Sequence, residues 1–271
     1  MSRRNLQGNV VVISGAGGGL GRALAERFAL DGARLVLLDV DRAGAEQTAG
    51  IVGQSGGEGL ALACDVTDAG ACQAAVQAGV ERFGRVDVLV NNAGLSHRSA
   101  FARTDPAVIR HVVEVNFFGA VNLTHAALPF LLQSRGAIAA ISSVAGFTPL
   151  IARTGYAASK HALHGFFDSL RTEVQPQGVD VTIACPSFIA TAIDRHALGA
   201  DGRPARHAQV VVGRRMTPEF VAERIHDGMS RRKPLLLIGS TAHQAWWLSR
   251  FAPSLYERIM VRRLHGEMTQ D

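Results

Sequence analysis

A tyrosine and a lysine lie four residues apart in the segment Tyr156-Ala157-Ala158-Ser159-Lys160. On a helix this spacing places both side chains on one face, one turn apart. A free phenol has a pKa near ~10, and a neighbouring ammonium favours the phenolate and lowers that pKa toward working pH. Proton transfer is most effective when the pKa lies near the operating pH. The pair is therefore a candidate acid/base centre, although an ordinary surface Tyr/Lys pair has the same spacing.

A glycine-rich turn near the N-terminus is a second candidate site. The turn follows an apolar run of strand length, opens a helical pattern and reads Ser14-Gly15-Ala16-Gly17-Gly18-Gly19-Leu20-Gly21. Glycine permits a tight turn and lets backbone N–H groups approach a pyrophosphate, to which the helix N-terminus adds partial positive charge. The run fits two glycine spacings, so it does not separate subfamilies of dinucleotide-binding proteins. A flexible loop is the alternative interpretation.

Two acidic residues end later strands. Asp39 lies eighteen residues beyond Gly21, where a carboxylate accepts hydrogen bonds from an adenosine ribose and repels the extra phosphate of NADP. We therefore expect NAD, with NADP as the alternative cofactor. A helix N-cap is the structural alternative for Asp39, and Asp41 could equally fill that role. Asp65-Val66 ends the third strand and is either an adenine contact or a cap for the following helix.

Strand-length apolar runs alternate with helical patterns along most of the chain. Their continuous hydrophobicity is typical of parallel strands that are covered on both faces. The predicted strands are Val10–Ser14, Arg34–Asp39, Leu60–Asp65, Val86–Asn91, Ala137–Ser142, Val179–Pro186 and Leu235–Ile238. The predicted helices are Leu20–Leu30, Asp41–Gly53, Asp68–Phe83, Val108–Leu132 (one helix or two) and Tyr156–Gln175. We predict an α/β, Rossmann-type doubly wound sheet of seven mostly parallel strands, with helices on both faces.

One domain of 271 residues accounts for the whole chain, and two of its segments lie outside the strand–helix alternation. Residues 187–217 have no strand pattern and begin at the carboxyl end of a strand, where open α/β sheets bind ligands. We interpret them as a substrate lid, with a disordered loop as the alternative. Residues 241–266 form a helical extension that mixes aromatics, leucines and arginines. We rank a subunit interface or the substrate mouth above contact with a membrane surface for this extension.

Composition restricts the class of protein. Net charge is +5, and charged residues make up 19% of the chain, without a long charged run. The basic excess fits an acidic partner, an anionic membrane surface or a solvated face; we favour the solvated face and expect no nucleic-acid partner. Three widely spaced cysteines indicate a reducing compartment, and we find neither a signal peptide nor an apolar run of the ~20 residues that span a bilayer. We therefore expect a soluble, cytoplasmic protein.

In the order and spacing of five motifs, the chain resembles the short, single-domain branch of the short-chain dehydrogenase/reductase family. The resemblance runs from about residue 9 to residue 238. The motifs are Ser14-Gly15-x-x-x-Gly19-x-Gly21, Asn91-Asn92-Ala93-Gly94, Asn116, Ser143 and Tyr156-x-x-x-Lys160. Any one of these motifs alone would be weak evidence for the resemblance.

The resemblance implies a role for each matching residue. Tyr156 would exchange a proton with the substrate oxygen, and Ser143 would hold that oxygen. Lys160 would lower the pKa of Tyr156 and hydrogen-bond the nicotinamide ribose. Asn116 would bend a helix and hold a water that links Lys160 to solvent. The cofactor-binding set comprises Ser14, Gly15, Gly17, Gly19, Leu20, Gly21, Asp39, Asp65, Val66, Asn92, Ala93, Gly94, Tyr156, Lys160, Pro186, Ile189 and Thr191.

The sequence departs from the family pattern after Pro186, where Ser187 replaces a glycine. A left-handed backbone at a non-glycine residue costs about 1 kcal/mol, so the path of this loop is open. Ile189 and Thr191 still match the family's nicotinamide contacts.

Reversible hydride transfer between a secondary alcohol and a ketone is the reaction that these residues imply. We expect a mainly apolar substrate because five apolar residues flank the centre in sequence, namely Phe147, Leu150, Ile151, Phe188 and Ile193. Core packing is the alternative for each of them. We expect no metal, because His161 and His164 have no third ligand. A non-catalytic nucleotide-binding or membrane-surface scaffold of the same fold is the alternative function.

A homodimer or homotetramer is implied by the same resemblance. The apolar stretches Val108–Leu132 and Tyr156–Leu170 have more hydrophobic surface than one sheet face requires. These helices would pair with their copies across a two-fold axis.

Overall fold

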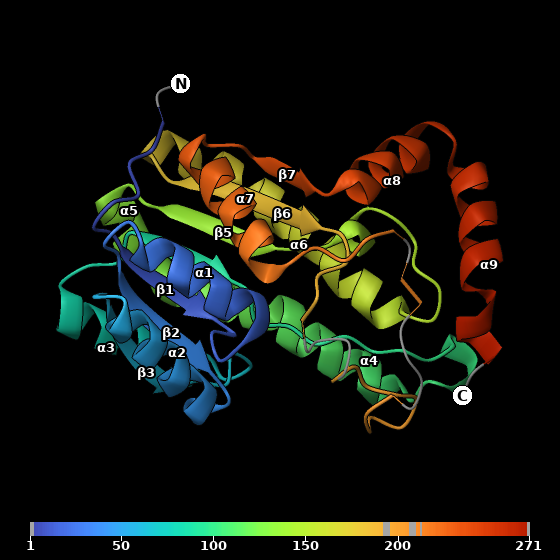
Figure 1. The fold of residues 1–271 in the computed structure, drawn as a ribbon, viewed down its shortest axis with the longest axis horizontal. Coiled ribbons are helices and arrows are strands. Elements are labelled where there is room, and N and C mark those ends of the chain that lie inside the picture. Colours follow the sequence, from blue (N-terminus) through green and yellow to red (C-terminus); the bar gives the residue numbers. More distant parts are fainter. Residues whose placement is uncertain (1–2, 192–195, 206–209, 212, 270–271) are drawn as a thin grey trace.

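Seven parallel strands form one sheet in the order β3-β2-β1-β4-β5-β6-β7 (Figure 1). The structure is a computed structural model and describes residues 3–191, 196–205, 210–211 and 213–269. The strands are β1 (Val10–Ser14), β2 (Arg34–Asp39), β3 (Glu58–Ala63), β4 (Val88–Asn91), β5 (Ala137–Ile141), β6 (Asp180–Pro186) and β7 (Leu235–Ile238). The predicted doubly wound parallel sheet is confirmed.

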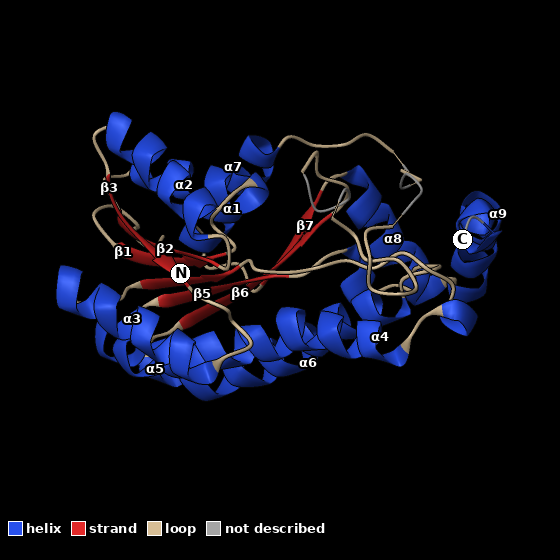
Figure 2. Ribbon diagram, turned by 90° about the horizontal axis from the view of Figure 1, so that it is seen from below, coloured by secondary structure: helices blue, strands red, loops and turns tan. Residues whose placement is uncertain are grey.

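Helices cover both faces of the sheet, as Figure 2 shows. One layer contains α1 (Gly19–Ala29), α2 (Arg42–Gln54) and α7 (Pro218–Ser230). The other contains α3 (Ala69–Phe83), α4 (Pro106–Val113), α5 (Gly119–Ser134) and α6 (Thr154–Val174).

The alternation of side chains along β1 divides the core in two. Val10 and Val12 belong to the buried cluster under α3, α5 and α6, whereas Val11 and Ile13 belong to the cluster under α1 and α7. All four side chains are fully buried. A strand covered on both faces in this way has no polar side, which explains its continuous apolar run.

Helices α4 and α5 are parts of one continuous helix that contains a π-helical turn, Glu114–Phe118. The expectation that no apolar run reaches membrane-spanning length was wrong for this stretch. Pro106–Ser134 is long and apolar enough to cross a bilayer, and 39% of its most apolar window is buried inside the chain. Here α5 packs against α3, and α4 packs against α6, as helices of a sheet-covering layer do. Core helices of soluble proteins meet the same length and composition test.

Two further helices follow β7 and lie beyond the carboxyl ends of the strands (Figures 1 and 2). They are α8 (Ser240–Phe251) and α9 (Pro253–Thr269). Buried Ala245, Tyr256, Met260 and Leu264 form a small cluster there that is separate from the two sheet cores. This cluster attaches the C-terminal helices to the loop after β5, where Val144 and Phe147 pack against it.

Candidate active site

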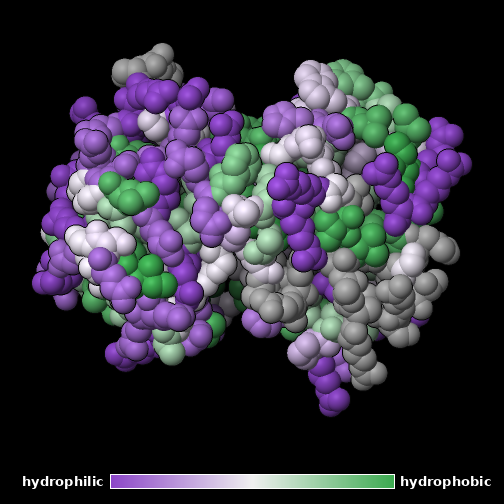
Figure 3. Space-filling view, viewed as in Figure 1, coloured by the Kyte–Doolittle hydropathy of each residue, from purple (hydrophilic) through white to green (hydrophobic). Residues whose placement is uncertain are grey.

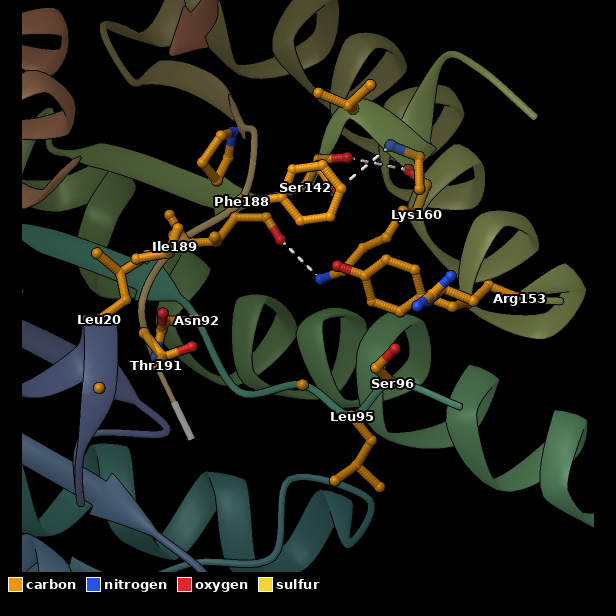
Figure 4. A pocket seen from close by; sticks show the side chains of 18 of the residues that line it. Leu20, Asn92, Leu95, Ser96, Ser142, Arg153, Lys160, Phe188, Ile189 and Thr191 are labelled. Carbon is orange, nitrogen blue, oxygen red and sulfur yellow. Dashed lines mark hydrogen bonds between the residues drawn. The ribbon is translucent and has the colours of Figure 1, made fainter. Parts of the chain in front are cut away.

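A cavity of about 960 Å³ opens at the carboxyl ends of the strands. Strand order reverses between β1 and β4, and open α/β sheets bind ligands at such a point. Most of the predicted site residues line this cavity, from the glycine-rich turn at one end to Tyr156 at the other. Ser14, Gly21 and Asn116 do not line it. Figure 4 shows Leu20, Asn92 and Thr191 on one side, and Lys160 and Arg153 on the other.

The glycine-rich turn takes a path that requires glycine. Gly15 and Gly19 have φ of 65° and 53°, in the left-handed region. A Cβ on Gly21 would lie 2.0 Å from the carbonyl oxygen of Gly15, so a side chain there would force α1 away from the turn. The turn therefore presents bare backbone and a helix N-terminus to the cavity, a geometry that fits a pyrophosphate.

Ser14 and Asn92 support this turn from behind. The Ser14 hydroxyl accepts hydrogen bonds from the backbone N–H groups of Asn92 and Ala93, at 3.0 and 3.1 Å. The Asn92 side-chain amide donates to the carbonyl oxygens of Ser14 and Gly15, both at 3.0 Å. The ends of β1 and β4 are thereby held together at the point where the sheet order reverses.

The Asp39 carboxylate points at the glycine-rich turn. One oxygen accepts from the backbone N–H of Gly17 at 2.7 Å, and the other accepts from the backbone N–H of Asp41 at 2.9 Å. The N-cap position of α2 belongs to Asp41, so Asp39 does not cap that helix. Each carboxylate oxygen keeps a lone pair for a further donor. Val40, which follows it, is 76% exposed and brings no positive charge.

Asp65 also faces the cavity and does not cap the next helix. Its side chain accepts from the Thr67 backbone N–H at 2.9 Å and from the Thr67 hydroxyl at 2.8 Å. These hydrogen bonds from Thr67 lower the pKa of Asp65. Asp68 caps α3 instead, accepting from the N–H groups of Gly70 and Ala71.

Tyr156 and Lys160 lie one turn apart on α6, as their spacing predicts. The Lys160 Nζ lies 5.7 Å from the centroid of the Tyr156 ring and donates to the carbonyl oxygen of Ile141 at 2.8 Å. Burial removes water from this ammonium and lowers the pKa of Lys160 to about 8. The lysine is therefore mostly charged at neutral pH and close to its titration range.

Ser143 lies at the carboxyl end of β5 and also lines the cavity. Its hydroxyl oxygen accepts from the backbone N–H of Ala145 at 3.2 Å. This contact orients the hydroxyl and leaves its proton for another acceptor.

Asn116 lies behind these residues, at the centre of the π-helical turn. Its amide exchanges hydrogen bonds with the backbone of Leu95, accepting from N–H at 2.6 Å and donating to the carbonyl at 2.9 Å. It also donates to the Ser159 hydroxyl, which in turn donates to the Tyr156 carbonyl at 2.8 Å. The predicted helix distortion at Asn116 is present, and Ser159 is a supporting residue that the sequence analysis did not identify.

The loop after β6 does not need a left-handed residue at Ser187. Positive φ angles of non-glycine residues in the described part of the chain occur at Arg135, Ala152 and Arg232 only. The left-handed residue is instead Gly239, φ 94°, which follows β7 and lies against the Ser187 hydroxyl. Glycine is not required after Pro186 because Ser187 has no positive φ, and the missing side chain of Gly239 leaves room for the Ser187 hydroxyl.

Pro186, Ile189 and Thr191 line the cavity as predicted. Ile189 pairs with Met216, so the two ends of the predicted lid lie side by side. The Thr191 side chain would lie 3.3 Å from a Cβ on Gly19. Within the predicted lid, Leu198 pairs with His97 from the loop after β4.

Of the five apolar residues expected around the substrate, Leu150 and Phe188 line the cavity. Phe147 and Ile151 instead pack against the C-terminal helices, and Ile193 lies outside the described residues.

The far wall of the cavity comes from the C-terminal helices, whose individual residues the sequence analysis did not identify. Residues that face the cavity from α8 and α9 include Ala245, Leu248, Tyr256, Ile259, Met260 and Arg263. The spacing of Tyr256, Met260 and Leu264 at i, i+4 and i+8 is a signal that could have found one face of α9. Arg153, three residues before Tyr156, also lines the cavity and is 2% exposed.

No group of three or more potential metal ligands exists among the residues that the structure describes. His161 bonds the Ala157 carbonyl within its own helix, and His164 lies 3.5 Å from the Cys185 sulfur. Burial lowers the pKa of His164. The two histidines therefore make separate packing contacts.

Comparison with known families identifies the chain. Residues 9–200 match the family described as short chain dehydrogenase. The protein belongs to the short chain dehydrogenase/reductase family. It is 37% identical to dehydrogenase/reductase SDR family member 7B of Bos taurus over 98% of this chain and 84% of that protein. It is 34% identical to dehydrogenase/reductase SDR family protein 7-like of Drosophila melanogaster, over 96% of this chain and 82% of that protein.

A solved structure of this family has the same fold. It is a short chain dehydrogenase/reductase from Burkholderia phymatum in complex with NAD, with a TM-score of 0.82 and 27% sequence identity. The match covers 93% of this chain and 96% of that one. The family places this protein among the oxidoreductases.

Proposed function

We propose that this short chain dehydrogenase uses NAD to interconvert a secondary alcohol and its ketone, with Tyr156 as acid/base. The observation that carries the proposal is the position of the Lys160 ammonium beside the Tyr156 ring, in a cavity shared with the glycine-rich turn. An ammonium next to a phenol stabilises the phenolate, which is the form that accepts a proton. A non-catalytic scaffold would not need this arrangement.

NAD fits the other end of the cavity. The bare backbone of the turn suits a pyrophosphate, and Asp39 can accept hydrogen bonds from ribose hydroxyls. The same carboxylate repels the phosphate of NADP, and Val40 offers no compensating cation. The Burkholderia relative, which is in complex with NAD, supports this choice.

When bound, NAD supplies the acceptor for a hydride. In the oxidative direction we assign to the Ser143 hydroxyl a hydrogen bond to the substrate oxygen. The Tyr156 phenolate takes the hydroxyl proton as the carbon loses its hydride, and the product is a ketone. Lys160, held by the Ile141 carbonyl, stabilises the phenolate. The proton on Tyr156 then leaves toward solvent by way of Lys160, which releases one proton as it accepts the other. Reduction runs through the same groups in reverse.

We propose a mainly apolar substrate for this cavity. Leu150, Phe188, Leu248, Ile259 and Met260 contribute apolar side chains to its walls. Transfer of apolar surface out of water is favourable by about 25 cal/mol per Å², so such walls select an apolar substrate body.

Oxidation of a panel of secondary alcohols, followed by NADH absorbance, tests the proposal. Tyr156→Phe removes the proton acceptor and should lower kcat by a factor of about 10² to 10⁴, while the Kd for NAD changes little. The other tyrosine of the chain gives a matched control, because Tyr256 also lines the cavity. Tyr256→Phe should keep kcat within about tenfold, since it takes no part in proton transfer. Equal turnover by Tyr156→Phe and the unmodified protein would refute the mechanism.

A further inference from the structure

The corner between α8 and α9 exposes three large apolar side chains, Trp247, Phe251 and Leu255, which we call the α8–α9 patch. Their exposed fractions are 61%, 74% and 44%. The Trp247 and Phe251 rings stack, with centroids 5.3 Å apart and an interplanar angle of 19°. Figure 3 shows hydrophobic residues gathered over the same corner, with hydrophilic residues beside them.

The neighbouring Trp246 is packed against other side chains, in contrast to the exposed Trp247. Its ring packs edge-on against Phe147 at 4.9 Å and under the Arg250 guanidinium at 4.2 Å. One tryptophan of the pair is therefore used for packing, whereas the adjacent one contributes nothing to the core. Large exposed apolar groups that lie together mark interaction sites.

Exposed arginines lie on the same two helices as the patch. Arg250, Arg258 and Arg262 are exposed, and Arg263 is exposed at the cavity wall. Helix α8 has no acidic residue, and α9 has Glu257 and Glu267 only. An apolar face with aromatic residues, on helices with exposed arginines and few acids, is complementary to the interface of an anionic bilayer.

A second copy of the chain fits this surface less well. A two-fold contact through the patch would bring the arginine-bearing helices of two copies together, and like charges that meet across an interface are repelled. An anionic lipid surface instead neutralises all of them.

The two helices carry the patch on one side and the cavity wall on the other. Leu248 of α8 and Ile259 and Met260 of α9 face the cavity, whereas Trp247 and Phe251 face away from it. We propose that the α8–α9 patch docks the enzyme on anionic phospholipid membranes and brings the cavity to the bilayer surface. An apolar substrate dissolved in the bilayer would then reach the cavity over a short path, a consequence that rests on the proposed function.

Co-sedimentation with vesicles tests the docking without any turnover. The protein should bind phosphatidylglycerol-containing vesicles at low salt, bind pure phosphatidylcholine vesicles more weakly, and be released by about 1 M salt, which shortens the screening length to about 3 Å. A protein that does not bind the anionic vesicles at low salt overturns the proposal. Tyr156→Phe should bind vesicles like the unmodified protein, so a failure of the catalytic proposal is distinguishable from a failure of docking.

A matched pair of double variants localises the contact. Trp247→Ser with Phe251→Ser should weaken vesicle binding about tenfold or more, equivalent to about 1.4 kcal/mol. Leu30→Ser with Phe220→Ser removes two side chains that are 77% and 51% exposed elsewhere, and it should bind normally. Equal loss in both variants, or a patch variant that only changes the oligomeric state, contradicts the proposal.

Fluorescence tests the contact without altering the patch. Trp246→Phe leaves Trp247 as the sole tryptophan. Lipids with brominated chains should quench its emission, and absence of quenching in bound protein would show that another surface touches the vesicle.

Discussion

Lys160 and Lys233 are the only lysines among the 28 basic residues of this chain, and the remainder are arginines. Arginine keeps its charge under all conditions, whereas a buried lysine can release a proton near neutral pH. Lys160 is 5% exposed, and its ammonium has the Ile141 carbonyl as its hydrogen-bond acceptor. A lysine thus lies at the position where the proposed mechanism moves a proton beside Tyr156.

The lowered pKa of Lys160 predicts a pH-dependent effect on stability. The folded-state pKa is about 8, and the unfolded chain titrates near ~10.4, so between these values the unfolded state binds more protons. The free energy of unfolding should therefore rise with pH in this window. Relative to Lys160→Met, the unmodified protein should gain about 1 kcal/mol between pH 7 and pH 9 in urea denaturation.

Lys233→Met is the control, because this lysine is exposed. It should show no such pH-dependent difference. An equal pH response of the unmodified protein and Lys160→Met would show that the lysine is not desolvated in the folded state.

Asp39 should set the choice between NAD and NADP. Asp39→Asn keeps an oxygen that can accept from the Gly17 N–H but removes the charge that repels a phosphate. Combined with Val40→Arg, it should lower the ratio of kcat/KM with NAD to kcat/KM with NADP by about ten- to a hundredfold. This factor corresponds to the free energy of one hydrogen bond to a charged group. Val40→Arg alone should change the ratio less. An unchanged ratio in the double variant would place the adenosine ribose elsewhere.

At the scale of elements, the glycine-rich turn and α1 must stay in close contact. Gly21→Ala would place a methyl group 2.0 Å from the Gly15 carbonyl oxygen, so it should lower the free energy of unfolding by about 1–3 kcal/mol and weaken NAD binding. Gly50→Ala in the middle of α2 has open space and should instead stabilise by about 0.5–1 kcal/mol. Urea denaturation measures both changes. A neutral Gly21→Ala would mean that α1 is free to shift.

Continuous apolar runs predicted β1, β2 and β7 with their observed bounds, because strands covered on both faces contain few polar residues. The prediction for β3 was displaced by two residues. This strand lies at the sheet edge, where Glu58 is exposed and still pairs with Arg34. An exposed polar residue inside a strand gives no hydrophobic signal.

The supports of the site depend on contacts between distant segments, which explains what the sequence did not reveal. The π-helical turn at Asn116 is stabilised by Leu95 and Ser159, which lie 21 and 43 residues away. The room for the Ser187 hydroxyl depends on the missing side chain of Gly239 in another loop. In contrast, Asp39, Asn92 and Ser143 lie at or just after strand ends, and topology alone brings strand ends together.

At the scale of the whole molecule, one helical layer has apolar surface that this chain does not cover. Only 39% of the apolar window in Pro106–Ser134 is buried, and Phe118 is 45% exposed. Figure 2 shows that α5 and α6 belong to the outer layer on this face. We propose that a second copy covers it, as the sequence analysis expects for a homodimer or homotetramer.

Sedimentation at micromolar concentration should show a dimer or tetramer. Phe118→Glu should dissociate this assembly, because the contact would then bury an unpaired carboxylate. Phe220→Glu on α7 should leave the assembly intact. A monomer of the unmodified protein would contradict the assembly. The cytoplasmic location expected from the sequence is likewise a proposal, and binding of a cytoplasmic assembly to anionic lipid through α8–α9 is compatible with it.

A crystal structure of the complex with NAD would show whether the cofactor and Tyr156 share one site. We predict the pyrophosphate on the turn at Gly15–Gly21, the adenosine ribose on Asp39, and the nicotinamide ring beside Tyr156 and Lys160. The Tyr156 hydroxyl should lie where it can hydrogen-bond, within about 3.2 Å, a substrate oxygen held next to that ring. A nicotinamide ring far from Tyr156, or a nucleotide bound outside this cavity, would contradict the account.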